Sequence, residues 1–349
     1  MSSYIRPEIL AMHGYVPGEQ PREGSIVKLN TNENPYPSSP AVQRAIGRAI
    51  QSGLQKYPDP LATAFRTRAA ELLGVEPNWI LCGNGSDDLL TIVTRAFVGQ
   101  GDCLRLPYPS YILYKTLAQL QGAEAEEILF EKDWSLGENF AKPRPRLKLA
   151  FLPNPNSPSG TVIPSGRVKE LAATLPCPLL VDEAYVDFAE TNCIALVKVT
   201  DKIMVSRSLS KSYALAGLRF GFIIAQPHII QQLQKVKDSY NCDALSIGGA
   251  TAAIDDQAWL AGNRAKILAT RAKLAAGTRA LGFATVESQA NFVWNPHPSV
   301  PVKSLYEQLK TAGVLVRYMD YRGWGDGLRI SVGTDEQIDT CLNLLRGMV

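Results

Sequence analysis

Short apolar runs alternate with helical patterns along the first two thirds of the chain. The apolar runs end in polar residues, and the segments between them repeat apolar residues at helical spacing. From about residue 40 to residue 226, this alternation predicts a mostly parallel sheet flanked by helices, an α/β fold. The expected strands are 79–82, 103–106, 148–152, 178–181, 202–206 and 220–225, and the expected helices are 40–53, 61–73, 87–98 and 111–121.

The last third of the chain has a different pattern. It begins with helical spacing, which predicts one long helix over 248–276, and then apolar runs alternate with two shorter helical segments. The expected runs are 291–294, 314–317 and 328–332, and the expected helices are 302–312 and 335–347. This pattern predicts a smaller α+β domain. We expect an N-terminal arm over 1–35 that packs with the small domain, a large domain over 36–240 and the small domain over 241–349.

Composition and charge exclude several classes of protein. The chain has 36 basic and 33 acidic residues, a balance that gives no reason to expect a nucleic-acid or membrane-surface partner. Its apolar segments are too short and too interrupted to cross a bilayer, and the N-terminus lacks the apolar core of a signal peptide. The six cysteines are scattered singly and there are only three histidines, so no metal site is expected. We therefore expect a cytoplasmic protein with reduced thiols.

The segment SLSKSYALAGLRFG, residues 208–221, holds the densest group of reactive side chains. Lys211 follows an expected strand, with hydroxyl groups at Ser208 and Ser210 and a guanidinium at Arg219. A lysine beside an arginine can have a lowered pKa and is then nucleophilic enough to form a Schiff base. The hydroxyls and Arg219 would bind a phosphate group beside it. By itself, the pattern fits a solvated loop equally well.

Asp182 ends an expected strand in the sequence LLVDEAYVDF, and Tyr185 lies three residues later. Burial raises the pKa of a carboxyl group, so a buried ionised carboxylate needs a cationic partner. The protonated pyridine nitrogen of pyridoxal phosphate is such a partner. An aspartate that caps a helix at the strand exit is the alternative interpretation.

Two further turns place polar side chains after apolar runs. The sequence GNGSDD, residues 83–88, opens an expected helix, where free backbone N–H groups bind phosphate. The sequence NPNSPSG, residues 154–160, is a rigid turn whose polar side chains can contact a ligand. Either turn alone could be an ordinary connection. The first lacks the third glycine and the downstream acid of a dinucleotide fingerprint, which disfavours a nicotinamide dehydrogenase.

Along the chain, the Gly-rich turn comes first, followed by the Asn-Pro turn, the strand-end Asp182 with Tyr185, and then Lys211. In this order, the four motifs resemble the fold-type-I pyridoxal-phosphate aminotransferases. The segments RPEILAMHGYVPGEQP, LNTNENPYP, KYPDP and LRISVG make the chain similar, over nearly its whole length, to the histidinol-phosphate aminotransferase family. The resemblance implies a mostly parallel central sheet flanked by helices, with a smaller α+β domain. It also implies pyridoxal 5'-phosphate as cofactor and transamination between histidinol phosphate and 2-oxoglutarate, a step of histidine biosynthesis, in a homodimer.

The resemblance also implies roles for individual residues. Lys211 would hold the cofactor and move the substrate proton, Asp182 would keep the pyridine nitrogen protonated, and Tyr185 would donate to the ring oxygen. Tyr111 would stack on the ring, and the phosphate would be bound by Gly85, Ser86, Asp87, Ser208, Ser210, Arg219 and by Tyr57 reaching into the other subunit's site. Substrate contacts would come from Arg329 at the α-carboxylate, Arg317 and Tyr15 at the substrate phosphate, and Asn32 and Glu33 at the imidazole.

One position departs from the family pattern. The family often has the sequence N-N-P-T-G, in which the second asparagine contacts the ring oxygen of the cofactor. Here that position is Ser157, preceded by Asn156. Either Asn156 makes the contact instead or the shorter Ser157 does so, and we expect Asn156.

Three other functions compete with this interpretation. An aspartate or aromatic-amino-acid aminotransferase, or a threonine-phosphate decarboxylase, would share the fold and most of the motifs. A non-catalytic pyridoxal-phosphate sensor would be expected to carry a DNA-binding domain, and the segment before the first expected helix is too short for one. A nicotinamide dehydrogenase would need the missing fingerprint.

Overall fold

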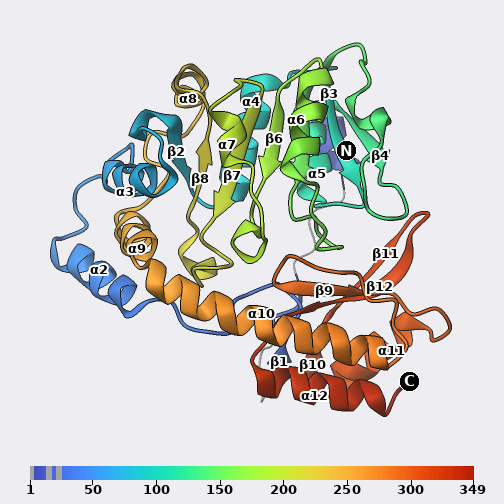
Figure 1. Cartoon of the computed structure of the whole chain (residues 1–349). Helices are drawn as coiled ribbons and strands as arrows, with labels where there is room; N and C mark the ends of the chain where they lie inside the picture. Colours follow the sequence, from blue (N-terminus) through green and yellow to red (C-terminus); the bar gives the residue numbers. More distant parts are fainter. Residues whose placement is uncertain (1–3, 13–17, 21–25) are drawn as a thin grey trace.

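The chain folds into a larger and a smaller lobe (Figure 1). The structure, a computed structural model, describes residues 4–12, 18–20 and 26–349. The larger lobe contains a seven-stranded sheet with the order β2-β8-β7-β6-β5-β3-β4. Its strands are β2 (Ile80–Gly83), β3 (Cys103–Tyr108), β4 (Glu124–Leu129), β5 (Leu147–Pro153), β6 (Leu179–Asp182), β7 (Ile203–Ser208) and β8 (Gly221–Ile224). Only β8 runs antiparallel to its neighbours in this sheet, which confirms the predicted mostly parallel sheet.

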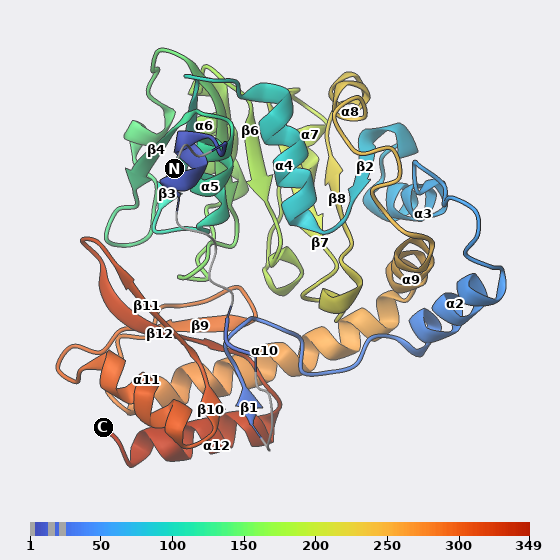
Figure 2. The ribbon, with the colours of Figure 1, turned by 180° about the vertical axis from the view of Figure 1, so that it is seen from behind.

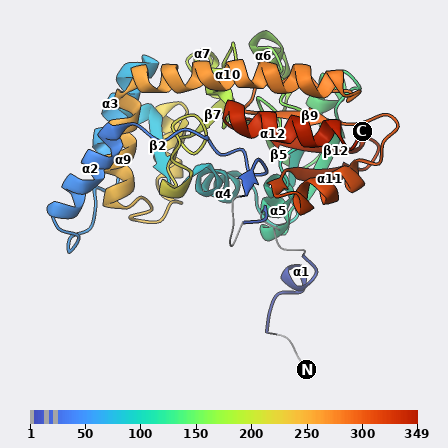
Figure 3. The same cartoon turned by 90° about the horizontal axis from the view of Figure 1, so that it is seen from below.

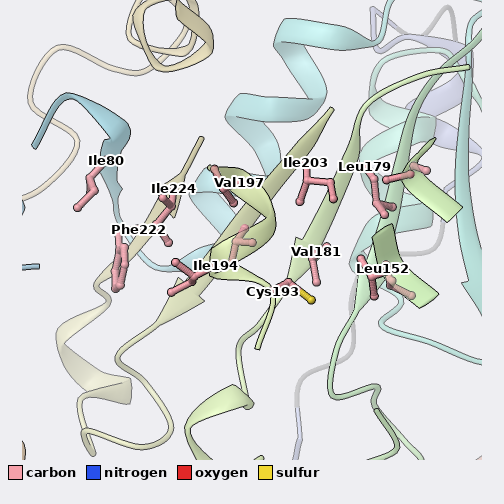
Figure 4. Packing of buried hydrophobic residues seen from close by; sticks show 14 of the residues in the cluster. Ile80, Leu152, Leu179, Val181, Cys193, Ile194, Val197, Ile203, Phe222 and Ile224 are labelled. Atoms are coloured by element: carbon pink, nitrogen blue, oxygen red, sulfur yellow. The ribbon is translucent and has the colours of Figure 1, made fainter. Parts of the chain in front are cut away.

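Helices cover both faces of this sheet because alternate strand residues bury apolar side chains on opposite sides. On β6, Leu180 packs toward one face, whereas Leu179 and Val181 pack toward the other with Ile194 and Val197 (Figure 4). The first face is covered by α4 (Ser86–Phe97), α5 (Leu113–Leu120) and α8 (Pro227–Leu233). The second is covered by α3 (Thr63–Leu73), α6 (Ser165–Thr174), α7 (Ile194–Val197) and α9 (Ala244–Asp255).

The edge strand β4 was absent from the sequence prediction. Its sequence, EAEEIL, has no apolar face, and its residues are half-buried or exposed. An edge strand needs one hydrogen-bonded neighbour, here β3, and it tolerates charged side chains. Glu126 of β4 also accepts a hydrogen bond from the buried Arg105 of β3, with Nε 2.7 Å from Oε2. Pairing with β3 and this ion pair therefore stabilise β4, although its sequence has no hydrophobic pattern that would predict a strand.

The smaller lobe is an α+β unit, as the pattern of the last third predicted. A three-stranded antiparallel sheet has the order β11-β12-β9, and β1 pairs in parallel with β10 beside it. Its strands are β1 (Val27–Lys28), β9 (Phe292–Asn295), β10 (Val314–Leu315), β11 (Arg317–Tyr321) and β12 (Gly325–Ser331), and its helices include α11 (Val302–Thr311) and α12 (Asp335–Arg346). The remaining short segments are α1 (Pro7–Leu10), η1 (Pro77–Trp79), η2 (Glu138–Ala141), η3 (Val186–Phe188) and η4 (Ala216–Leu218).

The single helix expected over 248–276 is wrong, because the chain forms two helices there. The first, α9, packs on α2 (Pro40–Gln51) and α3 of the larger lobe, and α10 (Gln257–Ala280) extends from there to the smaller lobe (Figure 3). Asp256 separates them with ψ of 65°, and its carboxylate accepts hydrogen bonds from the Trp259 backbone N–H and from Ser39. An aspartate that caps a new helix start ends the previous one. Among the described residues, no helix is long and apolar enough to cross a membrane.

Candidate active site

A cavity of about 520 Å³ is lined by residues of both lobes. Tyr108, Pro153, Asp182 and Ser208 end the strands β3, β5, β6 and β7, and all four line it. The carboxyl ends of parallel strands meet at one edge of a sheet, which is where ligands bind in such folds. The smaller lobe contributes β11 and β12, which lie across from this edge (Figure 2). The cavity is also lined by the predicted site residues Asn32, Ser86, Asp87, Tyr111, Tyr185, Ser210, Lys211, Arg219, Arg317 and Arg329.

Lys211 lies in the turn that follows β7, and its ammonium points into this cavity. Its Nζ donates to the backbone oxygen of Thr31 at 3.3 Å and lies 5.9 Å from the centre of the Tyr185 ring. Burial, together with the nearby guanidinium of Arg329, lowers the pKa of Lys211 from 10.5 to about 8. A lysine with this pKa has an appreciable neutral fraction at neutral pH, so it can act as a nucleophile or as a base.

Asp182 is buried at the carboxyl end of β6. Its two oxygens accept hydrogen bonds from the Tyr114 hydroxyl at 2.8 Å and the Ser206 hydroxyl at 3.0 Å. Burial raises the pKa of this carboxyl, and the two hydrogen bonds act in the opposite direction. Among the described residues, no lysine or arginine hydrogen-bonds to this carboxylate. A buried carboxylate facing a cavity without its own cation fits a ligand that brings a positive N–H, such as a protonated pyridine.

An anion site is built where α4 begins. Gly85 has φ of +82°, and a Cβ there would lie 2.6 Å from Nη2 of Arg219. That guanidinium extends to the Ser210 hydroxyl at 3.4 Å and to the Asp87 carboxylate at 3.5 Å. A helix N-terminus, a hydroxyl and a guanidinium together bind a phosphate group. With the neighbouring lysine and Asp182, the donor set therefore fits pyridoxal phosphate.

Tyr185 and Asn32 support each other at the wall of the cavity. The Asn32 amide donates to the Tyr185 hydroxyl at 3.0 Å, and Asn32 is in turn fixed by two hydrogen bonds with the Ser331 hydroxyl. The Tyr185 ring packs edge-on against Phe292, 5.0 Å between centres. Asn32 therefore orients Tyr185 in addition to lining the cavity.

Two arginines of the smaller lobe face the cavity from adjacent strands. Arg317 of β11 and Arg329 of β12 are direct cross-strand partners. Like charges in this position destabilise a sheet, so the pair is suited to an anionic ligand. Arg329 is held by the Ser157 hydroxyl at 2.9 Å and the Asn30 backbone oxygen at 3.2 Å, while its buried Nε has no hydrogen-bond partner in the described part of the chain.

Ser157, rather than Asn156, lines the cavity among the described residues. The Asn156 amide donates to the backbone oxygen of Pro109 at 3.2 Å and to the Ser159 hydroxyl at 2.9 Å, and its buried Oδ1 has no partner among the described residues. The donor hydrogens of Asn156 are thus used by the segment after β3 and by its own turn. This geometry favours Ser157 for contact with a ligand, although Asn156 was expected to make it.

Three other predicted residues lie elsewhere. Glu33 forms an ion pair with Lys28, with 2.5 Å between Nζ and Oε2, and is outside the cavity wall. Tyr57 is 80% exposed and stacks on Tyr240, with ring centres 4.4 Å apart. Tyr15 lies outside the described residues.

Sequence reasoning missed Tyr114 and Ser206, the two hydroxyl donors to Asp182. Tyr114 is 68 residues from Asp182, and Ser206 is 24 residues away on the next strand. Ser206 could have been found, because the parallel register places it beside Asp182. Tyr114 lies three residues after Tyr111, about one helical turn. That spacing does not indicate which strand end the Tyr114 side chain faces, so its contact with Asp182 could not be predicted.

The fold and this cavity define a fold-type-I aminotransferase. The family model of aminotransferase class I and II matches residues 24–345. The structure superposes on a histidinol-phosphate aminotransferase from Sinorhizobium meliloti with a TM-score of 0.90, at 24% identity over 100% of this chain and 99% of that one. Aspartate aminotransferase from Thermus thermophilus gives 0.85 at 20% identity, with both chains fully covered.

Two relatives in sequence indicate which family within this class the chain belongs to. The histidinol-phosphate aminotransferase of Rhodopirellula baltica is 55% identical over 97% of this chain and 94% of its own length. Histidinol-phosphate aminotransferase 1 of Nostoc is 43% identical over 100% and 99%, respectively. The chain therefore belongs to the histidinol-phosphate aminotransferase family, within class I and II aminotransferases.

Proposed function

We propose that this chain exchanges an amino group between histidinol phosphate and 2-oxoglutarate, giving imidazole acetol phosphate and glutamate in a step of histidine biosynthesis. The observation that carries the proposal is a single cavity lined by Lys211, Asp182 and the Arg317–Arg329 pair. The lysine and the aspartate suit the cofactor, and the arginines suit anionic substrates. The 55% identity to the enzyme of Rhodopirellula baltica supports the same substrate pair.

The cofactor is pyridoxal 5'-phosphate, which when bound withdraws electrons from the substrate carbon that loses its proton. Asp182 would pair with the ring nitrogen, Tyr185 would donate to the ring oxygen, and Tyr111 would pack on the ring. The phosphate would be bound by Gly85, Ser86, Asp87, Ser208, Ser210 and Arg219. Ser157 lines the cavity and accepts a hydrogen bond from Arg329, and it would contact the ring oxygen in place of Asn156, which hydrogen-bonds to Ser159.

Lys211 would hold the cofactor covalently and, once the substrate has released it, would act as the base. Its Nζ would then take the proton from the substrate carbon, a role that requires the neutral amine. The pKa of about 8 in the ligand-free chain favours that neutral form more than the pKa of an ordinary lysine does. Tyr185, fixed by Asn32, keeps the hydrogen-bond donor to the ring oxygen in place.

The arginine pair allows one cavity to accept two different substrates. Glutamate has an α-carboxylate, whereas histidinol phosphate has a neutral hydroxymethyl group there and a phosphate at its far end. Arg329 would bind the α-carboxylate and Arg317 would bind the phosphate. Of the two residues expected at the imidazole, Asn32 lines the cavity and would contact it, whereas Glu33 lies outside the cavity wall.

The working enzyme is a cytoplasmic homodimer. Tyr57 is exposed, stacks on Tyr240 and does not line the cavity of its own chain. An aromatic pair of this kind suits a protein interface. In the dimer, Tyr57 reaches the cofactor phosphate of the partner subunit, which completes the site.

A half-reaction titration tests this function. Purified enzyme loaded with cofactor is mixed with histidinol phosphate, and the change in cofactor absorbance is followed in parallel with aspartate, phenylalanine and threonine phosphate. The proposal requires histidinol phosphate to react with the highest kcat/KM. A preference for one of the other three would reject it, and Lys211→Ala should lose covalent attachment and slow turnover by about 10²–10⁴-fold or more.

A further inference from the structure

We propose that Tyr114 is a positioning residue whose phenol fixes the orientation and charge of the Asp182 carboxylate for the ring nitrogen of the cofactor. The proposal rests on the proposed function, in which Asp182 pairs with that nitrogen. Its basis is a hydrogen bond of 2.8 Å from the Tyr114 hydroxyl to Oδ2 of Asp182. Tyr114 lies in the first turn of α5 and lines the same cavity.

The surroundings of Tyr114 are those of a core phenylalanine except at its hydroxyl group. Its side chain is fully buried, and its ring packs against Phe151, 4.9 Å between centres, and edge-on against Tyr111 at 5.6 Å. A buried hydroxyl is destabilising unless it is hydrogen-bonded. Packing alone would be satisfied by phenylalanine, so the hydroxyl is explained by its bond to Asp182.

The two hydroxyl donors bind different oxygens of the Asp182 carboxylate. Tyr114 donates to Oδ2, and Ser206 donates to Oδ1 at 3.0 Å. An ionised carboxylate has about four acceptor positions, and the backbone N–H of Ala184 also donates to this one, so about one position remains for a further donor. The two side-chain bonds come from different elements, α5 and β7, and fix the plane of the carboxylate, which determines where that free position points.

The charges around Asp182 make these donors important. Burial and the carboxylate of Asp87 on α4 raise the pKa of Asp182, whereas Tyr114, Ser206 and the backbone N–H of Ala184 lower it. Burial also raises the pKa of Tyr114 well above its usual value, so this phenol stays protonated and remains a donor. Without it, Asp182 is more readily protonated and binds a cationic N–H less well.

The test is the affinity of Tyr114→Phe for two forms of the cofactor. One is pyridoxal phosphate, and the other is its 1-deaza analogue, in which carbon replaces the ring nitrogen. Both carry the aldehyde and the phosphate, so the lysine and the phosphate site act on them alike. We expect the variant to bind pyridoxal phosphate about 10-fold more weakly, the lower limit for a hydrogen bond to a charged group, and to bind the analogue as the wild type does.

A matched control is Thr94→Val, which removes another buried hydroxyl, one that donates to the Leu90 backbone oxygen of α4. It should change neither affinity. Equal weakening of both cofactors by Tyr114→Phe would assign Tyr114 to packing, and no weakening of either would also overturn the proposal. A wild-type enzyme that binds both forms equally would instead reject the pairing of Asp182 with the nitrogen. The half-reaction titration judges the proposed substrate independently of all these outcomes.

Discussion

The ammonium group of Lys211 destabilises the folded, cofactor-free chain, and Lys211→Met should remove that penalty. The folded protein lowers the lysine pKa from 10.5 to about 8, through burial and the positive charge of Arg329. At about 1.4 kcal/mol per pH unit, this corresponds to about 3 kcal/mol as an upper limit. Methionine has a similar length and no charge, so it keeps most of the packing.

The sign of the pH dependence follows from proton binding. Below pH 8, the lysine is protonated in both the folded and unfolded chain, and the folded chain bears the full penalty. Between pH 8 and 10.5, the unfolded chain keeps a proton that the folded chain has released, so wild-type stability rises with pH. Lys211→Met should therefore be more stable than wild type by up to about 3 kcal/mol at pH 7. This advantage should fade as the pH approaches 10.5.

Urea unfolding of the two cofactor-free proteins, followed by circular dichroism from pH 7 upward, measures this difference. Other groups titrate in both proteins and cancel in the comparison. Lys303→Met, at an exposed position of α11, controls for the loss of one positive charge. A stability difference between Lys211→Met and wild type that does not change with pH would refute the reasoning, because it would show that the lysine has the same pKa in both states.

The remaining predictions concern substrates, cofactor and core. Arg329→Ala should slow the half-reaction with glutamate by about 2–5 kcal/mol in barrier and affect histidinol phosphate much less, whereas Arg317→Ala should mainly impair histidinol phosphate. Stopped-flow absorbance of the cofactor measures each half-reaction separately. Equal slowing of both half-reactions by Arg329→Ala would contradict the assignment of Arg329 to the α-carboxylate. Gly85→Ala should weaken cofactor affinity in equilibrium dialysis, since its Cβ would lie 2.6 Å from a guanidinium nitrogen. Glu183→Gln should lower the free energy of unfolding by less than the roughly 3–5 kcal/mol typical of a buried charge left fully unpaired, because the half-buried Arg207 keeps only its longer ion pair with Asp187 at 3.7 Å. An unchanged urea midpoint would exclude this.

The fold was predictable wherever burial imposes an apolar pattern. The buried strands β5, β6 and β7 and the helices beside them stand out in the sequence, since both faces of the sheet are covered. The break between α9 and α10 depends on Asp256 and its contact with Ser39, 217 residues away in sequence. Strand β4 depends on pairing with β3. Neither long-range contact leaves a local signal.

The candidate site was predictable to the extent that strand ends determine it. Asp182 ends β6 and Lys211 lies three residues after β7, and the parallel arrangement brings both to one edge of the sheet. The contacts that tune them come from elsewhere: Tyr114 from a helix, and Arg329 from the other lobe. The choice between Asn156 and Ser157 depended on side-chain direction within a turn, which composition does not specify.

The positive charge of the cavity couples substrate binding to the proton affinity of Lys211. Arg329 holds down the pKa of Lys211 and, in the proposed function, also binds the carboxylate of glutamate. A bound carboxylate offsets part of the field of that guanidinium, so the proton affinity of the Lys211 nitrogen rises when glutamate is present. The lowered pKa thus favours the neutral form of the free amine, and a bound carboxylate makes that amine a stronger base when the proton to be removed lies beside it. Histidinol phosphate carries its charge at the other end, near Arg317, so this effect should be weaker for that substrate, and the pH profiles of the two half-reactions should differ.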